Sequence, residues 1–215
     1  DKKKLLELSE KNVRYFMKDK LEQADKLNPE HRIDRLMTQM QKDLRLPVKP
    51  HHIECFDNSN FQGDYAVAAM SVFKNGRPSK SDYRHFDIKT VTGPDDFASM
   101  EEVVFRRYKR LLEEEKPLPQ LIVIDGGKGQ LSAALTSLEK LELRGKISII
   151  GIAKKLEEIY YPGDPLPLYL DKKSETLKII QQLRDEVHRF GITHHRNKRS
   201  KGLIKTELSE IKGIG

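Results

Sequence analysis

The stretch LIVIDGGKGQL, residues 121–131, is an apolar run that ends in Asp125 and enters a glycine-rich turn. A second apolar run, HHIECFD at 51–57, also ends in an aspartate, Asp57. Short apolar runs bounded by turn residues are typical of buried strands. Two carboxylates brought side by side repel one another unless a hard cation such as Mg²⁺ or Mn²⁺ neutralises them. The first chemistry that these residues suggest is therefore a divalent-metal site built on Asp57 and Asp125.

The glycine-rich turn allows a second interpretation, a cradle for nucleotide phosphates. A P-loop needs a glycine, four residues, and then Gly-Lys followed by a Ser or Thr whose hydroxyl serves Mg²⁺. Here Lys128 is followed by Gly129 and the loop is too short, so we favour the metal interpretation. Gly126 and Gly127 then let the chain turn sharply past Asp125, or let a phosphate backbone approach. A structural alternative, in which each aspartate only caps a turn, stays open.

A third functional group comes from the stretch QLRDEVHRFGITHHR, residues 182–196. Helical periodicity predicts a buried stripe made of Thr176, Ile180, Leu183, Val187 and Phe190. His188 lies on the flank of that stripe, in line with Leu177, Gln181 and Arg184. An imidazole there can bind a metal ion or relay a proton, although a lone helical histidine is more often a boundary residue. Arg184 is a candidate phosphate clamp or a partner for a nearby acid, whereas Asp185 and Glu186 point to other faces.

The elements that must position these residues follow a simple order. The sequence predicts three strands, a helix, a strand, a helix, a strand, a β-hairpin or irregular insertion, and a last helix. Their ranges are 51–57, 65–73, 82–89, from about 93, 121–125, 130–143, 146–154, 156–171 and 174–190. The turn KNGR at 74–77 joins the second and third strands, because Asn and Gly tolerate the positive φ of a hairpin turn. The first of these helices is expected to bury one face, made of Phe97, Met100, Val104, Tyr108 and Leu111. The second is expected to bury Leu131, Ala134, Leu135, Leu138 and Leu141.

This order predicts a mixed sheet with the two aspartates at one edge. Hairpin linkage makes the first three strands antiparallel, and right-handed crossovers through helices make the fourth strand parallel to one of them. The simplest such sheet sets the strand ending in Asp125 beside the strand ending in Asp57. Their carboxyl ends then meet at the edge that active sites of open α/β sheets favour.

The composition narrows the class of protein. The chain has 215 residues, with 40 Lys and Arg against 33 Asp and Glu, which gives a net charge of +7. This excess favours a polyanionic partner. A single cysteine, Cys55, excludes an internal disulfide framework and indicates a reducing, cytoplasmic location. No apolar run approaches the roughly 20 residues needed to span a bilayer, so no membrane partner is expected.

The two ends of the chain differ from its middle. Residues 1–45 are predicted to be helical, with Asn28 as a cap and Pro29 in the first turn of a second helix. The stretch LPVKP then breaks the pattern and marks a domain boundary. Both termini look like cuts from a longer protein. We expect a helical connecting segment, an α/β domain and a C-terminal fragment, at 1–49, 50–202 and 203–215.

Four sequence blocks together resemble the UvrC family, the incision subunit of bacterial nucleotide excision repair. They are ECFDNSNFQG, GPDDFASM, IDGGKGQL and RDEVHRFGITHHRNKRSK, and they occur in the family's order across residues 50–201. The region is similar to the family's C-terminal endonuclease domain. The resemblance implies a ribonuclease H-like α/β fold, which we expect as a mixed five-stranded sheet flanked by helices with an N-terminal helical extension. The tail LSEIKGIG resembles the first half of a helix-hairpin-helix.

The resemblance also implies metal-dependent hydrolysis of a DNA phosphodiester on the 5′ side of a lesion. The family's catalytic and metal-binding residues fall on Asp57, Asp125 and His188, with Mg²⁺ or Mn²⁺ as the cofactor. His188 stands where related nucleases carry a further carboxylate. A fourth acidic residue tied to activity matches Asp96, although helix capping by Asp95 and Asp96 is a structural explanation for this pair. The implied partners are damaged double-stranded DNA and UvrB in complex with DNA.

Basic residues near these positions are expected to meet the DNA backbone. They are Lys128, Arg184, His195, Arg196, Lys198, Arg199 and Lys201. Contacts between basic side chains and phosphates make affinity fall steeply with salt. Two alternative functions stay open. One is another nuclease of the same fold, which cuts RNA in a hybrid or resolves a DNA junction, and the other is a DNA-binding module without catalysis.

Overall fold

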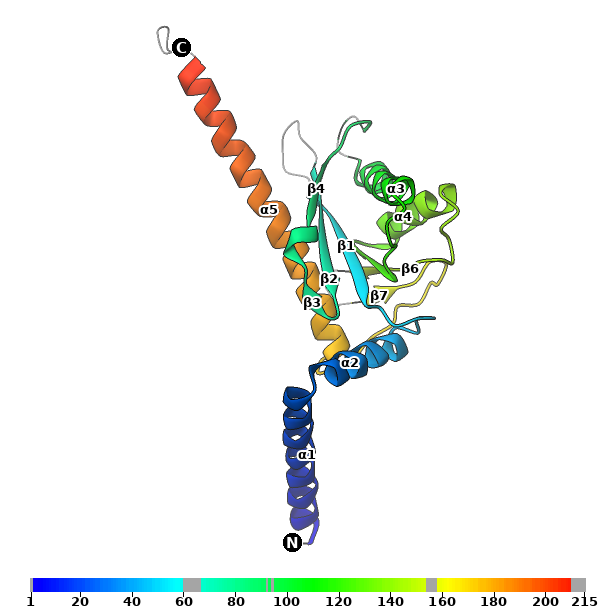
Figure 1. Ribbon diagram of the computed structural model, residues 1–215, viewed down its shortest axis with the longest axis vertical. Coiled ribbons are helices and arrows are strands. Elements are labelled where there is room, and N and C mark those ends of the chain that lie inside the picture. The colour runs from blue at the N-terminus through cyan, green and yellow to red at the C-terminus, as the bar shows by residue number, and fades with distance from the viewer. Residues whose placement is uncertain (1, 60–66, 92, 94, 154–157, 210–215) are drawn as a thin grey trace.

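The chain forms one α/β body from which two helices extend (Figure 1). The computed structural model describes residues 2–59, 67–91, 93, 95–153 and 158–209, without the side chains of 22, 24–27, 59 and 194–209. The helices are α1 (Lys2–Leu27), α2 (Pro29–Asp43), α3 (Asp96–Glu113), α4 (Lys128–Lys140) and α5 (Glu175–Ser209), with a short 3₁₀ turn at Lys80–Asp82. The strands are β1 (His52–Ser59), β2 (Val67–Lys74), β3 (Arg77–Pro78), β4 (Arg84–Asp87), β5 (Leu121–Asp125), β6 (Ser148–Ala153) and β7 (Glu158–Tyr160).

The sheet confirms the predicted fold class and its central strand pairing. Its order is β3-β2-β1-β5-β6-β7, with β4 also paired to β2. The pairs β1–β5 and β5–β6 are parallel, whereas β1–β2 and β6–β7 are antiparallel. The expected five strands are present, and the short strands β3 and β7 bring the sheet to seven. The predicted insertion at 156–171 supplies β7, which adds a strand next to β6 at that edge of the sheet.

The hairpin at KNGR forms as predicted. Asn75 and Gly76 both have positive φ, at 53° and 72°, as a two-residue hairpin turn requires. The partner directly after the turn is β3, which contributes only two residues. The chain then makes the 3₁₀ turn and returns along β2 as β4. The predicted strand at 82–89 is therefore shorter in the structure, at Arg84–Asp87.

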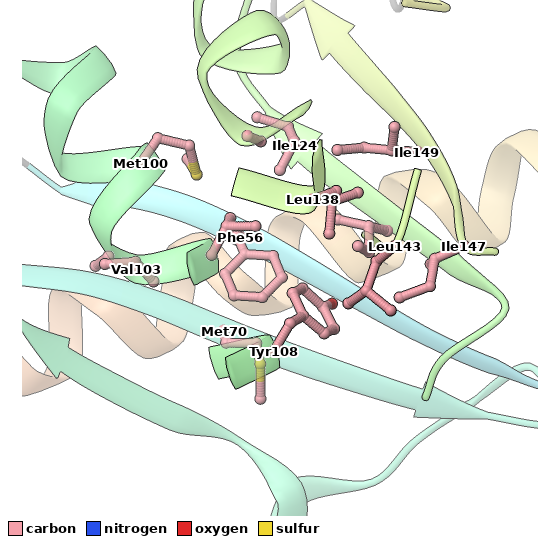
Figure 2. Close-up of a cluster of buried hydrophobic side chains, with 14 of the residues drawn as sticks. Phe56, Met70, Met100, Val103, Tyr108, Ile124, Leu138, Leu143, Ile147 and Ile149 are labelled. Carbon is pink, nitrogen blue, oxygen red and sulfur yellow. The ribbon is translucent and has the colours of Figure 1, made fainter. Parts of the chain in front are cut away.

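Helices α3 and α4 cover one face of the sheet over a close-packed apolar core (Figure 2). In this core Tyr108 of α3 packs edge-on against Phe56 of β1, with ring centroids 6.2 Å apart. The predicted inner face of α3 is confirmed for Met100, Val104, Tyr108 and Leu111, which are buried. It is wrong for Phe97, which is 57% exposed. Phe97 lies in the first turn of α3, where the helix has passed the edge of the core.

Helices α2 and α5 cover the opposite face. The stripe predicted for α5 is buried at four of its five positions, Thr176, Ile180, Leu183 and Val187. The fifth residue, Phe190, is half-buried. Helix α2 begins with the predicted cap, since Asn28 Oδ1 accepts a hydrogen bond from the His31 amide at 3.2 Å. The side chains of Met37, Met40 and Leu44, from α2 and its C-cap, are buried in the same core as α5. The α2 half of the predicted connecting segment thus packs into the α/β body.

Helix α1 stands away from this body (Figure 1). It exposes several large apolar side chains, among them Leu5 and Phe16, which are 74% and 63% exposed. Among the described helices, none combines the length and the apolar character that a membrane span requires.

Helix α5 is longer than the sequence predicted. The expected end at Phe190 is wrong, because the backbone continues as a helix to Ser209. Gly191, the residue after the predicted end, is a buried helical residue. The residues after it contain many Lys, Arg and Leu, which favour helices, and no proline. The predicted boundary between residues 202 and 203 falls inside α5, and the Gly-Ile-Gly turn at 213–215 lies outside the described residues.

Candidate metal centre

The register of β1 and β5 sets the two aspartates side by side. Phe56 lies opposite Ile124 in this parallel pair, so Asp57 and Asp125 follow at the same level. Side chains alternate between the two faces of a strand. Phe56 and Ile124 enter the core under α3 and α4, whereas Asp57 and Asp125 point to the face that α5 covers. The predicted meeting of the two carboxylates at one sheet edge is confirmed.

The imidazole of His188 joins the two carboxylates from α5. One ligand atom from each of Asp57, Asp125 and His188 lies within 4.8 Å of the others. Asp57 and Asp125 are only 2% and 3% exposed, whereas the His188 side chain is 53% exposed. The Nδ1 atom of His188 is 3.1 Å from Oδ2 of Asp57. The site therefore consists of two almost fully buried carboxylates and one imidazole that is half exposed to solvent.

The two carboxylates also act on the neighbouring thiol of Cys55. Burial raises the pKa of the Cys55 thiol well above its ordinary value, and the carboxylates of Asp125 and Asp57 raise it further. Arg184 acts on the same thiol in the opposite direction. Two carboxylates and one imidazole grouped in this way are a donor set that fits a hard divalent cation.

Two polar contacts hold α5, and with it His188, against the sheet. The hydroxyl of Ser71, buried in β2, donates to the Leu183 carbonyl at 3.1 Å. The hydroxyl of Tyr83, just before β4, donates to Glu186 Oε2 at 3.2 Å. Leu183 and Glu186 precede His188 by five and two residues. The turn of α5 that leads into His188 is therefore anchored on two sheet elements.

A third contact holds α5 just beyond the imidazole. The ring of His85, in β4, stacks on that of Phe190 with centroids 3.8 Å apart. The Nε2 atom of the same histidine is 3.1 Å from the Phe190 carbonyl oxygen. Contacts at Glu186 and Phe190 therefore lie two residues before and two residues after His188. We call Tyr83 and His85 the β4 brace.

Asp96 is not one of the three residues grouped at the metal site. Asp95, not Asp96, caps α3, because its Oδ1 accepts hydrogen bonds from the amides of Phe97 and Ala98 at 3.0 and 2.9 Å. The backbone carbonyl of Asp96 accepts a hydrogen bond from Asn58 Nδ2 at 2.7 Å. The residue after Asp57 thus ties the start of α3 to the end of β1.

The basic residues predicted to bind DNA have different surroundings. The Arg184 side chain is 18% exposed and donates to Asp185 Oδ1 at 3.1 and 3.2 Å. Lys128 Nζ donates to the Pro165 carbonyl at 2.7 Å and lies 4.8 Å from the centroid of the Tyr160 ring. The backbone of the run containing His195, Arg196, Lys198, Arg199 and Lys201 is part of α5, and its side chains lie outside the described residues.

Sequence reasoning missed a buried ion pair under α3. Glu54, in β1, is fully buried and accepts hydrogen bonds from Arg107 Nη2 at 2.6 Å and the Tyr108 hydroxyl at 2.8 Å. His52 Nε2 lies 3.3 Å from the same carboxylate. Burial acts to raise the pKa of Glu54, but its partners His52, Arg107 and Tyr108 outweigh burial, and the pKa is lowered. The signal was a glutamate inside an otherwise apolar strand.

Comparison with known proteins identifies a family. The model of the UvrC RNase H endonuclease domain matches residues 41–192. Proteins named UvrABC system protein C from Flavobacterium johnsoniae and Porphyromonas gingivalis are each 65% identical over all 215 residues. The one from Cytophaga hutchinsonii is 59% identical over 216 aligned residues. The chain spans 36% of the length of each of these relatives.

Solved structures show a weaker likeness. Endonuclease V from Bacillus subtilis is 14% identical with a TM-score of 0.39, over 76% of this chain and 93% of that one. Endonuclease V from Ciona intestinalis, in complex with a DNA containing inosine, is 20% identical with a TM-score of 0.37, over 73% and 68% of the two chains. Scores this low do not bear on the activity of the chain. The family model and the curated relatives do identify it: the chain belongs to the UvrC family and carries that family's RNase H-like endonuclease domain.

Proposed function

We propose that this chain is a divalent-metal-dependent endonuclease that hydrolyses a phosphodiester of damaged double-stranded DNA on the 5′ side of a lesion, in bacterial nucleotide excision repair. The observation that carries the proposal is the convergence of Asp57, Asp125 and His188 within 4.8 Å. The proposal is further supported by the family's endonuclease domain and by the name of its relatives, which assigns them to a UvrABC system. Such an activity belongs in the bacterial cytoplasm, where the DNA is.

The two aspartates are the residues that would hold the metal ion. Their carboxylates are almost fully buried on adjacent parallel strands, so their positions are fixed before any ligand arrives. When bound, Mg²⁺ or Mn²⁺ supplies positive charge that polarises the scissile phosphate and lowers the pKa of a nearby water. The same charge offsets the repulsion between the two carboxylates. Asp57 and Asp125 therefore bind and orient the cofactor.

His188 is in position to move a proton or to complete the metal site. Its Nδ1 atom faces Asp57 Oδ2 at 3.1 Å, and a histidine nitrogen bonded to a carboxylate in this way carries the proton. This tautomer leaves Nε2 as an acceptor on the exposed side of the ring. Nε2 then takes a proton from the attacking water, with Asp57 orienting the imidazole. In the alternative role, as the third ligand, the ring would use Nδ1, the nitrogen that faces Asp57, without its proton.

DNA is expected to lie along the open side of the site and along α5. The net charge of +7 favours a polyanion. The basic run at 195–201 continues on the helix that carries His188, about two to four turns beyond it. Arg184 is a further candidate phosphate contact because its side chain lies one turn before His188 on α5. We propose UvrB bound to damaged DNA as the protein partner, because the relatives are named as the C component of a UvrABC system.

A nicking assay tests the proposal. The substrate is a damaged duplex with bound UvrB, incubated with Mg²⁺ or Mn²⁺, and the proteins are the wild type, Asp57→Ala and Asp19→Ala. Asp19 is an exposed acid on α1, remote from the sheet, and serves as the matched control. We expect a metal-dependent 5′ nick from the wild type and from Asp19→Ala, and none from Asp57→Ala. Equal nicking by Asp57→Ala rejects the assigned site.

Two further substrates separate the proposal from another nuclease of this fold. Preferential cutting of an RNA–DNA hybrid indicates a hybrid nuclease, and preferential cutting of a four-way junction indicates a junction resolvase. A non-catalytic DNA-binding module binds damaged duplex but nicks none of these substrates and shows no response to Mn²⁺.

A further inference from the structure

The first turn of α3, which is hydrogen-bonded to the residue after Asp57, presents an exposed aromatic ring. Phe97 is 57% exposed, whereas the other members of its predicted helix face are buried. Single exposed aromatic side chains are common on protein surfaces, so exposure alone assigns no role. The position of this ring is what distinguishes it.

The backbone of Phe97 is fixed on both sides of the residue. Its amide donates to Asp95 Oδ1 at 3.0 Å, in the cap of α3. The preceding carbonyl, of Asp96, accepts a hydrogen bond from Asn58 Nδ2 at 2.7 Å. Because Asn58 follows Asp57 in β1, these contacts place Phe97 close to the end of the strand that carries the first metal-site carboxylate.

The ring of Phe97 lies directly on Gly129. A Cβ atom added to Gly129 would be 2.5 Å from Cε1 and 2.8 Å from Cζ of Phe97, so only glycine lets the ring lie this close. Gly129 is in the first turn of α4, four residues after Asp125. Four residues of extended chain span at most about 14 Å. The backbone before Phe97 is thus tied to the segment after Asp57 and its ring lies on the segment after Asp125, which places the ring within a few nucleotide lengths of Asp125.

We propose that Phe97 forms a binding subsite for a nucleoside of the DNA strand that is cut, and stacks on the base one to a few nucleotides from the scissile phosphate. The inference deepens the proposed endonuclease function and rests on it. Aromatic side chains bind nucleobases in any sequence because every base has a π-face. A ring fixed on a rigid helix start can hold that base in place with little loss of side-chain entropy. Gly129 keeps the neighbouring turn free of a side chain that would displace the ring.

Base removal from the DNA tests this contact directly. The full chain is prepared as wild type, Phe97→Leu and Phe97→Tyr, and its affinity for damaged duplexes is measured by fluorescence anisotropy in Ca²⁺. In each duplex an abasic analogue replaces one base near the cut. We expect one position at which base removal weakens wild-type binding about tenfold. Phe97→Leu should show that loss already on the intact duplex and no further loss at that position, whereas Phe97→Tyr should behave as the wild type.

The control is Phe16→Leu, the same change at a 63% exposed ring on α1, and thermal unfolding confirms that each variant is folded. If base removal has the same effect on wild type and Phe97→Leu at every position, the subsite is rejected. A Phe97→Leu protein that binds all duplexes normally but binds its protein partner more weakly also rejects it. Anisotropy reports binding without cutting, so its result on the subsite does not depend on the nuclease assay. Absence of cutting by the wild type rejects the proposed function but not the base contact.

Discussion

His188 Nδ1 and Asp57 Oδ2 lie 3.1 Å apart although 131 residues separate them in the chain. The contact joins the helix that ends the described chain to the first strand of the sheet. It forms only when α5 is fully seated on β1 and β2, because Leu183 and Val187 are buried in the same interface. Assembly of the candidate site is therefore coupled to folding of the entire α/β body.

Loss of a carboxylate is expected to remove activity and leave the fold intact. Asp125→Asn keeps the size of the side chain but removes a charge from the metal site. We expect nicking to fall at least about a hundredfold, which corresponds to roughly 3 kcal/mol of transition-state stabilisation. Circular dichroism should show an unchanged spectrum. Normal nicking by this variant contradicts the assigned role of Asp125.

Metal binding should stabilise the wild type and not the site variants. A ligand that binds only the folded state at about 100 times its Kd adds roughly 2.7 kcal/mol to the free energy of unfolding. Denaturant unfolding with and without Mn²⁺ measures this gain. We expect it to disappear in Asp57→Asn. A gain of the same size in both proteins would mean that Mn²⁺ binds elsewhere.

The β4 brace is expected to affect the site through α5. His85→Ala removes both the stack on Phe190 and the contact with its carbonyl. Residues that orient a metal ligand typically change metal affinity or activity by about 10–100-fold when they are removed. We expect a decrease near tenfold in nicking and in Mn²⁺ affinity, measured by titration. His51→Ala, at an exposed histidine before β1, is the control and should leave both unchanged.

The ion pair of Glu54 and Arg107 should make stability depend on pH. The pKa of Glu54 is lowered from its ordinary value of 4.5. The ionised carboxylate therefore makes its full contribution to the free energy of unfolding above pH 4.5 and loses it as the pH falls through the folded-state pKa. At pH 7, Glu54→Gln should cost about 3–5 kcal/mol, because it leaves the Arg107 charge buried without a counterion. The difference in free energy of unfolding between the wild type and Glu54→Gln should become smaller below about pH 4.5, as measured by urea unfolding.

Glu113→Gln is the matched control for that experiment. Glu113 lies on the same helix as Arg107, pairs with Lys109 at 3.8 Å and is largely exposed. Exposed pairs of this kind contribute less than about 1 kcal/mol. The difference in free energy of unfolding between the wild type and Glu54→Gln could instead stay constant from pH 7 to pH 3. This result would show that the pKa of Glu54 is the same in the folded and unfolded states.

The basic run on α5 should control how DNA binding depends on salt. Removing one phosphate contact lowers the steepness of log K against log salt by about 0.9. Neutralising Arg196, Lys198 and Arg199 to Gln should therefore reduce the slope by roughly 2–3 units, as measured by anisotropy between about 50 and 200 mM salt. Neutralising the three lysines at 2–4 of α1 serves as a charge-matched control. Equal effects of the two triple variants would indicate binding by net charge alone.

The sequence was sufficient to predict the arrangement around Asp57 and Asp125. Two apolar strands and their crossovers leave few ways to build the sheet; β5 ends in Asp125, and β1 continues two residues beyond Asp57 to Ser59. The flank position of His188 also followed from periodicity, because a 3.6-residue repeat fixes which side chains leave the core. These features depend on local patterns that the fold preserves.

Other features depend on contacts that no local pattern contains. Phe97 fits the helical stripe, but in the folded protein its ring lies on Gly129 of α4 and stays 57% exposed. The β4 brace joins residues about one hundred positions apart, and its stack on Phe190 exists only after α5 has packed. Gly191 signals a helix end in isolation, yet tertiary packing buries it inside α5.

The length of α5 has a mechanical consequence. This helix has 35 residues, and at 1.5 Å per residue it is about 50 Å long. The imidazole sits near its midpoint, and Lys201 is about 20 Å further along the same rod. The contact of His85 with Phe190 lies between the imidazole and the outer half of α5, so it holds the imidazole in place when the outer half bends or twists.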